Sequence, residues 1–177
     1  ASVAVDSSGN TYYTGSFGDF VLFGDIPLYS SGGSDIFVAK LNSSGSWQWA
    51  IKAGSSTHDE GMGIALDSSG HAYVTGYFKG TATFGSTSLT SSGSQDIFIA
   101  KLSSSGSWQW AVKAGGSTSN DWGNSIGVDS SGNSYVTGEF GGTMLFGSIS
   151  ITSSGSSEIF IAKLSSTGSW QWAVKAG

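Results

Sequence analysis

The sequence of 177 residues contains no cysteine and no arginine, and it has a single proline. Without cysteine there is no disulfide or thiol chemistry, and with only two histidines a catalytic zinc site or a Cys/His dyad is poorly supplied. Charged residues make up 11% of the chain, against about 25% in a typical soluble domain. Serine, threonine and 28 glycines take most of the polar and turn positions instead.

The few charges are mainly acidic. Seven lysines are outnumbered by 12 acidic residues, which leaves a net charge of -5. We therefore expect no binding to nucleic acid, because neutralising a phosphate backbone requires a basic surface. No apolar run approaches the roughly 18 to 20 residues of a membrane-spanning helix, so we expect no membrane insertion.

What the sequence does contain is one unit repeated three times. The copies are spaced by 61 and then 62 residues, and we divide the chain into 1–54, 55–115 and 116–177 as one continuous repeat domain. The extra residue falls in the loop between copies. The repeated motifs are Asp-Ser-Ser-Gly from Asp6, Asp67 and Asp129, Ile-Phe-(Val/Ile)-Ala-Lys-Leu from Ile36, Ile97 and Ile159, and Ser-Trp-Gln-Trp-Ala from Ser46, Ser107 and Ser169.

Each copy is predicted to form four β-strands and no helix. In the third copy, runs rich in β-forming residues occupy 125–129, 134–140, 158–164 and 169–176, separated by turn-forming Ser, Gly and Asn. The stretch 141–152 alternates more weakly and is predicted to be a long, partly paired connection. The fold class is therefore all-β, with three tandem four-stranded antiparallel repeats.

Alternation along the strands predicts which faces are buried. Counting by twos places Trp170, Trp172 and Val174 on one face of the last strand. The preceding strand, 158–164, has apolar residues on both faces. A sheet of this kind is covered on both sides, as in a sandwich or in stacked blades.

Two of the repeated stretches resemble the seven-bladed β-propeller repeat family of bacterial secreted proteins. The family pattern is present as DSSGNSYVTG at 129–138 and as DIFVAKL at 35–41. Three positions depart from it: Tyr13 replaces a valine, His71 an asparagine and Glu158 an aspartate. The resemblance implies a propeller-like fold and an extracellular or cell-surface location, and it implies no catalytic residues.

Three copies are too few for a closed propeller ring, which takes about 4 to 8 blades. An open arc leaves an apolar sheet face uncovered at each end, and such faces recruit partners. We therefore expect the partners to be adjacent repeats of a longer chain or further copies of this chain, assembled in a ring or a filament.

Six tryptophans are the main candidates for a binding role. An indole face can stack on a sugar ring, or it can pack between repeats. Packing is the favoured interpretation, because burying one tryptophan removes on the order of 200 Å² from water. The six form three Trp-x-Trp pairs: Trp47 and Trp49, Trp108 and Trp110, and Trp170 and Trp172.

Other polar residues have plainer explanations. The repeated Asp of Asp-Ser-Ser-Gly suits an Asx turn better than calcium binding, because one carboxylate is far short of the roughly 6 to 8 oxygens that calcium takes. The cluster at 58–60 is predicted to be a solvated loop, in which only Asp59 has a counterpart, Asp121, in the next copy. Two repeated lysine series are expected to cover apolar strand edges: Lys40, Lys101 and Lys163, and Lys52, Lys113 and Lys175.

No cluster of acid, base and nucleophile recurs in the three copies. We therefore expect a non-enzymatic structural or adhesive module of an extracellular or surface protein, without a cofactor or a metal. The alternative is a carbohydrate-binding module with one shallow site per repeat.

Overall fold

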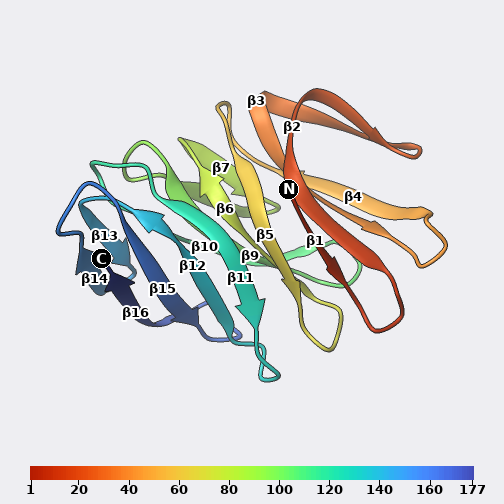
Figure 1. Ribbon diagram of the computed structural model, residues 1–177. Helices are drawn as coiled ribbons and strands as arrows, with labels where there is room; N and C mark the ends of the chain where they lie inside the picture. The colour runs from red at the N-terminus through yellow and green to blue at the C-terminus, as the bar shows by residue number, and fades with distance from the viewer.

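In the computed structural model, which describes all 177 residues, the chain forms three four-stranded antiparallel sheets that lie side by side (Figure 1). Each sheet lies within one sequence repeat, and the sheets do not close into a ring. The chain contains no helix and therefore none that could cross a membrane. The predicted all-β fold of three tandem, blade-like repeats is confirmed.

The first sheet contains the longest strands. It consists of β1 (Ser2–Val5), β2 (Thr11–Phe23), β3 (Ile26–Leu41) and β4 (Trp47–Ala53), in chain order. Beyond the sheet, β2 and β3 continue as a paired arm, which Figure 1 shows projecting from the upper end of the molecule.

The second and third sheets repeat this order and carry the arm as a separate two-stranded hairpin. The second sheet contains β5 (Glu60–Leu66), β6 (Ala72–Phe78), β9 (Asp96–Leu102) and β10 (Trp108–Ala114), with the hairpin β7 (Thr81–Phe84) and β8 (Thr87–Thr90). The third contains β11 (Trp122–Val128), β12 (Ser134–Phe140), β15 (Glu158–Leu164) and β16 (Trp170–Ala176), with the hairpin β13 (Thr143–Phe146) and β14 (Ile149–Thr152).

The four predicted strands of the third copy are all present and form its sheet, but the copy contains six strands and not four. The first strand begins at Trp122 instead of Ser125, and the predicted connection at 141–152 forms the β13–β14 hairpin.

A β-bulge in the last strand of each sheet separates the two tryptophans of each pair. In the third sheet Trp170 is opposite Leu164 and Trp172 is opposite Lys163, so the intervening Gln171 is the extra residue. The prediction that Trp170 and Trp172 share a face was therefore wrong. Counting by twos assumes an unbroken ladder, and a bulge moves the following residues to the other face.

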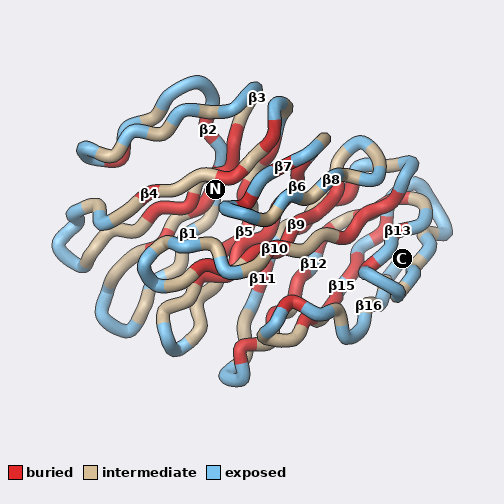
Figure 2. The backbone as a smooth tube through the Cα atoms, turned by 180° about the vertical axis from the view of Figure 1, so that it is seen from behind, coloured by how far each residue is buried: buried red, intermediate tan, exposed pale blue.

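The hydrophobic core lies between the sheets. One cluster of 14 buried residues joins the first and second sheets, and a cluster of 12 joins the second and third. Only three buried residues form a cluster on the outer face of the first sheet. Figure 2 shows the buried segments along the middle strands and the exposed segments at the turns and the hairpin tips.

In the second and third sheets, a glycine turn lies against a tryptophan of the preceding sheet. Gly106, in the turn before β10, lies so close to Trp49 that an added Cβ would come within 2.8 Å of the indole ring. Gly168 has the same relation to Trp110, at 3.1 Å. An added Cβ at the equivalent glycine of the first sheet, Gly45, has nothing within 4 Å.

This difference provides a matched test of the packing between sheets. Gly106 and Gly45 both have a positive φ, 82° and 77°, so alanine at either position has a similar backbone cost of roughly 1 to 2 kcal/mol. We expect Gly106→Ala to lower the free energy of unfolding by about 1 to 3 kcal/mol more than Gly45→Ala does, because its methyl group overpacks against Trp49. Urea denaturation measures both variants, and equal losses would contradict the contact.

Candidate functional site

The junction between neighbouring sheets is the most elaborate feature of the molecule, and it occurs twice with equivalent residues. At the outer rim, Gly54 pairs with Thr83 of the next sheet, and Gly115 pairs with Leu145. Both bridges are formed by two backbone hydrogen bonds, of 3.0 to 3.4 Å in the first and 3.1 to 3.2 Å in the second. The arm of each sheet is therefore tied to the last strand of the sheet before it.

The third sheet has an outer face without such a neighbour. On this C-terminal face, Ile159 is 51% exposed and Ile161 is 47% exposed. Their equivalents in the second sheet, Ile97 and Ile99, are fully buried at the junction with the third. Side chains of a kind that is buried at the internal junctions are thus in contact with water on this face.

The first sheet has the complementary uncovered face. On this N-terminal face, Val3 and Val5 are 54% and 60% exposed, whereas Ile64, the equivalent of Val3 in the second sheet, is 7% exposed. Each end of the molecule therefore presents one half of the junction that occurs twice inside it.

The six tryptophans pack edge-on or tilted against other aromatic rings and form no separate platform. All but Trp172 are partly buried, and Trp172, on the C-terminal face, is 39% exposed. The ring pairs are Trp47 with Phe23, Trp49 with Tyr12, Trp108 with Phe84, Trp110 with Tyr73, Trp170 with Phe146 and Trp172 with Tyr135, at centroid distances of 4.9 to 6.2 Å.

Indole N–H groups also join the sheets. Trp49 Nε1 donates to the Ser104 carbonyl at 3.2 Å, and Trp170 Nε1 donates to the Lys113 carbonyl at 3.3 Å. Both bonds connect one sheet to the next. The structure thus places the predicted candidates mainly in contacts within and between repeats.

Buried ion pairs at the rim were not predicted. The carboxylate directly before the repeated Ile-Phe in the third strand of each sheet binds the lysine 17 residues later, in the fourth strand. Asp35 and Asp96 are fully buried and each lies 2.7 Å from its lysine. The pairs are Asp35 with Lys52, Asp96 with Lys113, and Glu158 with Lys175. The constant 17-residue spacing was the sequence signal for them.

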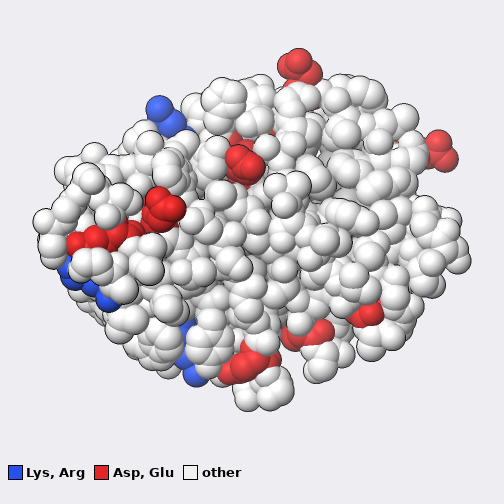
Figure 3. All heavy atoms as spheres, in the orientation of Figure 1, with Lys and Arg blue, Asp and Glu red and all other residues white.

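The other lysine series lies over tyrosine rings. The Nζ atom of Lys40 is 4.8 Å from the centroid of Tyr12, and Lys101 and Lys163 have the same relation to Tyr73 and Tyr135. Charges are otherwise sparse, and on the face in Figure 3 they form scattered groups on a largely uncharged surface.

The loops between sheets each contain a buried aspartate, which corrects the prediction of a solvated loop at 58–60. Asp59 is fully buried and accepts an N–H from Lys79 at 3.0 Å. Its counterpart Asp121 is also fully buried and accepts N–H groups from Gly116 at 2.8 Å and Gly141 at 3.4 Å. Each carboxylate thus connects its loop to the start of the next hairpin.

Burial shifts both carboxyl groups in the same direction. Desolvation raises the pKa of Asp121 to about 6, although the N–H groups of Gly116 and Gly141 partly oppose it, and the nearby Asp96 adds to the rise. Burial likewise raises the pKa of Asp59.

A raised pKa means that the folded state holds the proton more tightly than the unfolded state does. Between pH 3.8 and about 6, Asp121 therefore makes the protein less stable as the pH rises, by on the order of 3 kcal/mol in total. We expect the free energy of unfolding of the wild type, minus that of Asp121→Asn, to fall from pH 4 to pH 7 by roughly this amount. Denaturation at a series of pH values measures the difference, and a constant or rising difference would contradict the assignment.

The Asp-Ser-Ser-Gly turns are Asx turns, as predicted. Asp6 Oδ1 accepts the N–H groups of Ser8 and Asn10, both at 2.9 Å. Asp67 and Asp129 accept equivalent bonds. Nowhere in the chain do three or more histidine or acidic side chains converge so that they could hold a metal ion.

Polar clefts lie at both ends of the junctions. One cleft of about 430 Å³ lies between the Ser-Ser-Gly turns of the first and second sheets. A second, of about 270 Å³, lies between those of the second and third sheets. Each is lined by serines and by one stacked pair, Tyr12 with Lys40 or Tyr73 with Lys101. The Tyr12 hydroxyl is buried and has no hydrogen-bond partner.

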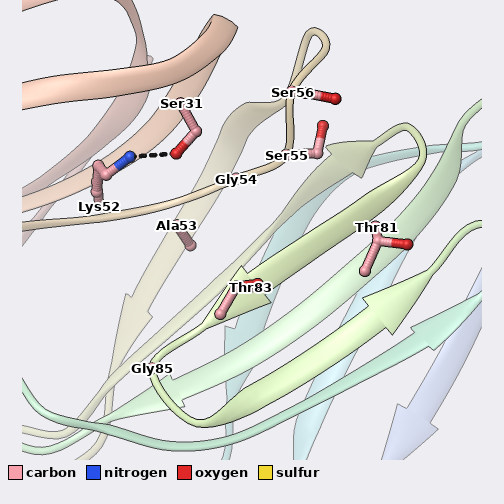
Figure 4. Close-up of a pocket in the computed structure, with 9 residues that line it drawn as sticks. All are labelled: Ser31, Lys52, Ala53, Gly54, Ser55, Ser56, Thr81, Thr83 and Gly85. Atoms are coloured by element: carbon pink, nitrogen blue, oxygen red, sulfur yellow. Dashed lines mark hydrogen bonds between the residues drawn. The ribbon is translucent and has the colours of Figure 1, made fainter.

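The opposite end of the first junction has a cleft of about 570 Å³. In Figure 4, Thr81 and Thr83 of β7 lie across it from Lys52, which donates a hydrogen bond to Ser31. The residues that line it are mainly serine, threonine and glycine, and they follow the rim at which Gly54 pairs with Thr83.

Sheets of four antiparallel strands, packed face to face and repeated in tandem, have the architecture of β-propeller blades. Comparison with known proteins agrees: residues 109–139 match a family model described as "Beta-propeller repeat". The matched segment runs from β10 through the connecting loop and β11 into β12, and thus spans the second junction.

A longer similarity extends to a viral protein. In an alignment of 110 residues that covers 52% of this chain, the sequence is 31% identical to an uncharacterized WD repeat-containing protein of Acanthamoeba polyphaga mimivirus. The aligned part covers 8% of that much longer protein.

Proposed function

We propose that this protein is a non-enzymatic structural or adhesive module of an extracellular or cell-surface protein, and that it acts by stacking β-propeller repeats into a larger array. The observation that carries the proposal is the pair of uncovered end faces. Each consists of residues whose equivalents are buried at the two internal junctions.

The energetics favour covering these faces. Fully burying a valine, leucine or isoleucine contributes about 1.5 to 3 kcal/mol, and each uncovered face exposes several such residues. A further repeat would also complete the rim bridge and the contact between tryptophan and glycine turn. The similarity to a WD repeat-containing protein also supports the proposed array, because the similar segment is only 8% of that much longer protein.

The proposed location rests on the resemblance of 129–138 and 35–41 to repeats of bacterial secreted proteins. A surface rich in serine and threonine, with few charges, suits a scaffold that extends or displays other parts of a protein.

A fourth repeat fused to the chain tests the array. Gly177 is equivalent to Gly115, so a second copy of residues 116–177 placed directly after Gly177 continues the register. We expect the added sheet to bury Ile159, Ile161 and Trp172, and so to raise the thermal midpoint and to lower binding of a hydrophobic dye at this face. As a control, the same fusion with Ile161→Lys should gain much less. A wild-type fusion that unfolds at the same temperature as the three-repeat chain would contradict the proposal.

The polar clefts support carbohydrate binding as a second candidate function. They recur at both junctions, and their serine hydroxyls and lysine ammonium groups are suitable partners for sugar hydroxyls. The tryptophans do not line these clefts, so a sugar site here would differ from the Trp-based one predicted from sequence.

A glycan array distinguishes this second function. A lectin should retain a defined set of sugars, and Lys40→Met combined with Lys101→Met should reduce binding by about tenfold or more, because charged hydrogen bonds are worth about 1.5 to 3 kcal/mol. Lys79→Met, outside both clefts, is the matched control. If no sugar is retained specifically, or if Lys79→Met loses as much binding as the double variant, carbohydrate binding in these clefts is contradicted.

A further inference from the structure

We propose that the C-terminal face of one chain, formed by β11, β12, β15 and β16, binds the N-terminal face of a second copy, formed by β1 to β4. The two copies thereby form a third junction of the type present inside each chain. This inference rests on the proposed function and goes further, because it names the partner as a separate copy.

The C-terminal face repeats the residues that already bind a following sheet. At the first junction the face consists of Tyr12, Ile36, Val38, Trp49, Ile51 and Ala53, and at the second of Tyr73, Ile97, Ile99, Trp110, Val112 and Ala114. The same positions of the third sheet are occupied by Tyr135, Ile159, Ile161, Trp172, Val174 and Ala176. Tyrosine, tryptophan and alanine are unchanged, and the other differences are between isoleucine and valine.

The N-terminal face has the residues that bind a preceding sheet. Phe37 and Leu41 lie on this face partly exposed. Their equivalents are fully buried at the internal junctions: Phe98 and Leu102 at the first, and Phe160 and Leu164 at the second. Both halves of the contact are therefore present on one molecule, at opposite ends.

The rim supplies polar and turn contacts in the same register. Gly177 is equivalent to Gly54 and Gly115, which pair with the next arm, and Leu22 is equivalent to Thr83 and Leu145, which receive that pairing. Likewise Trp172 is exposed and Gly45 has open space around it, whereas Trp49 and Trp110 each lie against a glycine turn. A head-to-tail contact satisfies all four groups at once.

One position of the N-terminal face departs from the pattern. Tyr13 occupies the position of Val74 and Val136 in the other two sheets, and both of those valines are fully buried. The Tyr13 ring lies 6.1 Å from the ring of Trp47. The larger side chain must shift when a second copy docks. Tyr13→Val is therefore expected to tighten the association.

A head-to-tail contact joins two different faces, so each copy in a dimer still has one unused face. Association then continues to a closed ring or to an open filament, depending on the rotation between copies. Both products contain the same junction.

The test uses one variant that blocks each face. Ile161→Lys blocks the C-terminal face and Val3→Lys the N-terminal face, and both residues are about half exposed in the single chain, so the fold should tolerate them. Val174→Lys, on the C-terminal face, is a second blocking variant. Leu145→Lys is the matched control, because Leu145 is 51% exposed but lies at an internal junction on neither end face.

Analytical ultracentrifugation measures the particle mass over a concentration series, with circular dichroism to verify folding. We expect the wild type and Leu145→Lys to form species larger than one chain, and each blocking variant alone to associate about tenfold more weakly or worse, because the lysine must be desolvated at the junction. An equimolar mixture of Ile161→Lys and Val3→Lys has one intact pair of faces. It should form two-chain particles and stop there.

Three outcomes would overturn the inference. Val3→Lys that still dimerises alone, while Ile161→Lys does not, would indicate pairing of two C-terminal faces. Equal loss in Leu145→Lys would indicate nonspecific association. A wild type that stays a single chain at every concentration would also contradict the inference. If the four-repeat fusion is nonetheless stabilised, the proposed array within one chain still holds. If the fusion is not stabilised either, both proposals fail.

Discussion

Each sheet in this protein is apolar on both faces, and this one constraint determines the rest of the architecture. A single four-stranded sheet of this composition cannot bury its own side chains, so the core forms between sheets. The middle sheet, covered on both faces, contains Phe98 and Ile99 side by side on one strand and pointing in opposite directions, both fully buried. The outer sheets each bury only one face in this way.

The polar groups of the junction fix how one sheet docks on the next. Asp59 and Asp121 are buried in the connecting loops and bind backbone N–H groups at the start of the following hairpin. The buried carboxylates of Asp35 and Asp96 are held by lysines within their own sheet. Because an unpaired buried charge is costly, the contacts of Asp59 and Asp121 favour one docking geometry over other ways of packing two apolar sheet faces together.

Sequence periodicity predicted the repeat, the strands and the uncovered ends, because those depend on local β-propensity and on the spacing of motifs. It placed Trp170 and Trp172 on one face, since a bulge at Gln171 leaves no mark in the hydrophobic pattern. It also took Asp59 for a solvated residue, because burial of a short polar loop depends on the neighbouring hairpin and not on the loop's own composition. The ion pairs were visible only as a constant spacing between acid and lysine.

The central claim is that stability in this chain comes from contacts between sheets. Native-state hydrogen exchange on the single chain tests it most directly, because amide protection reports the free energy of opening strand by strand. The account predicts the slowest exchange in β6 and β9 of the middle sheet, with lower protection in the equivalent strands β12 and β15 of the last sheet. Equal protection of β9 and β15 would show that each sheet is stable by itself, and would contradict the account.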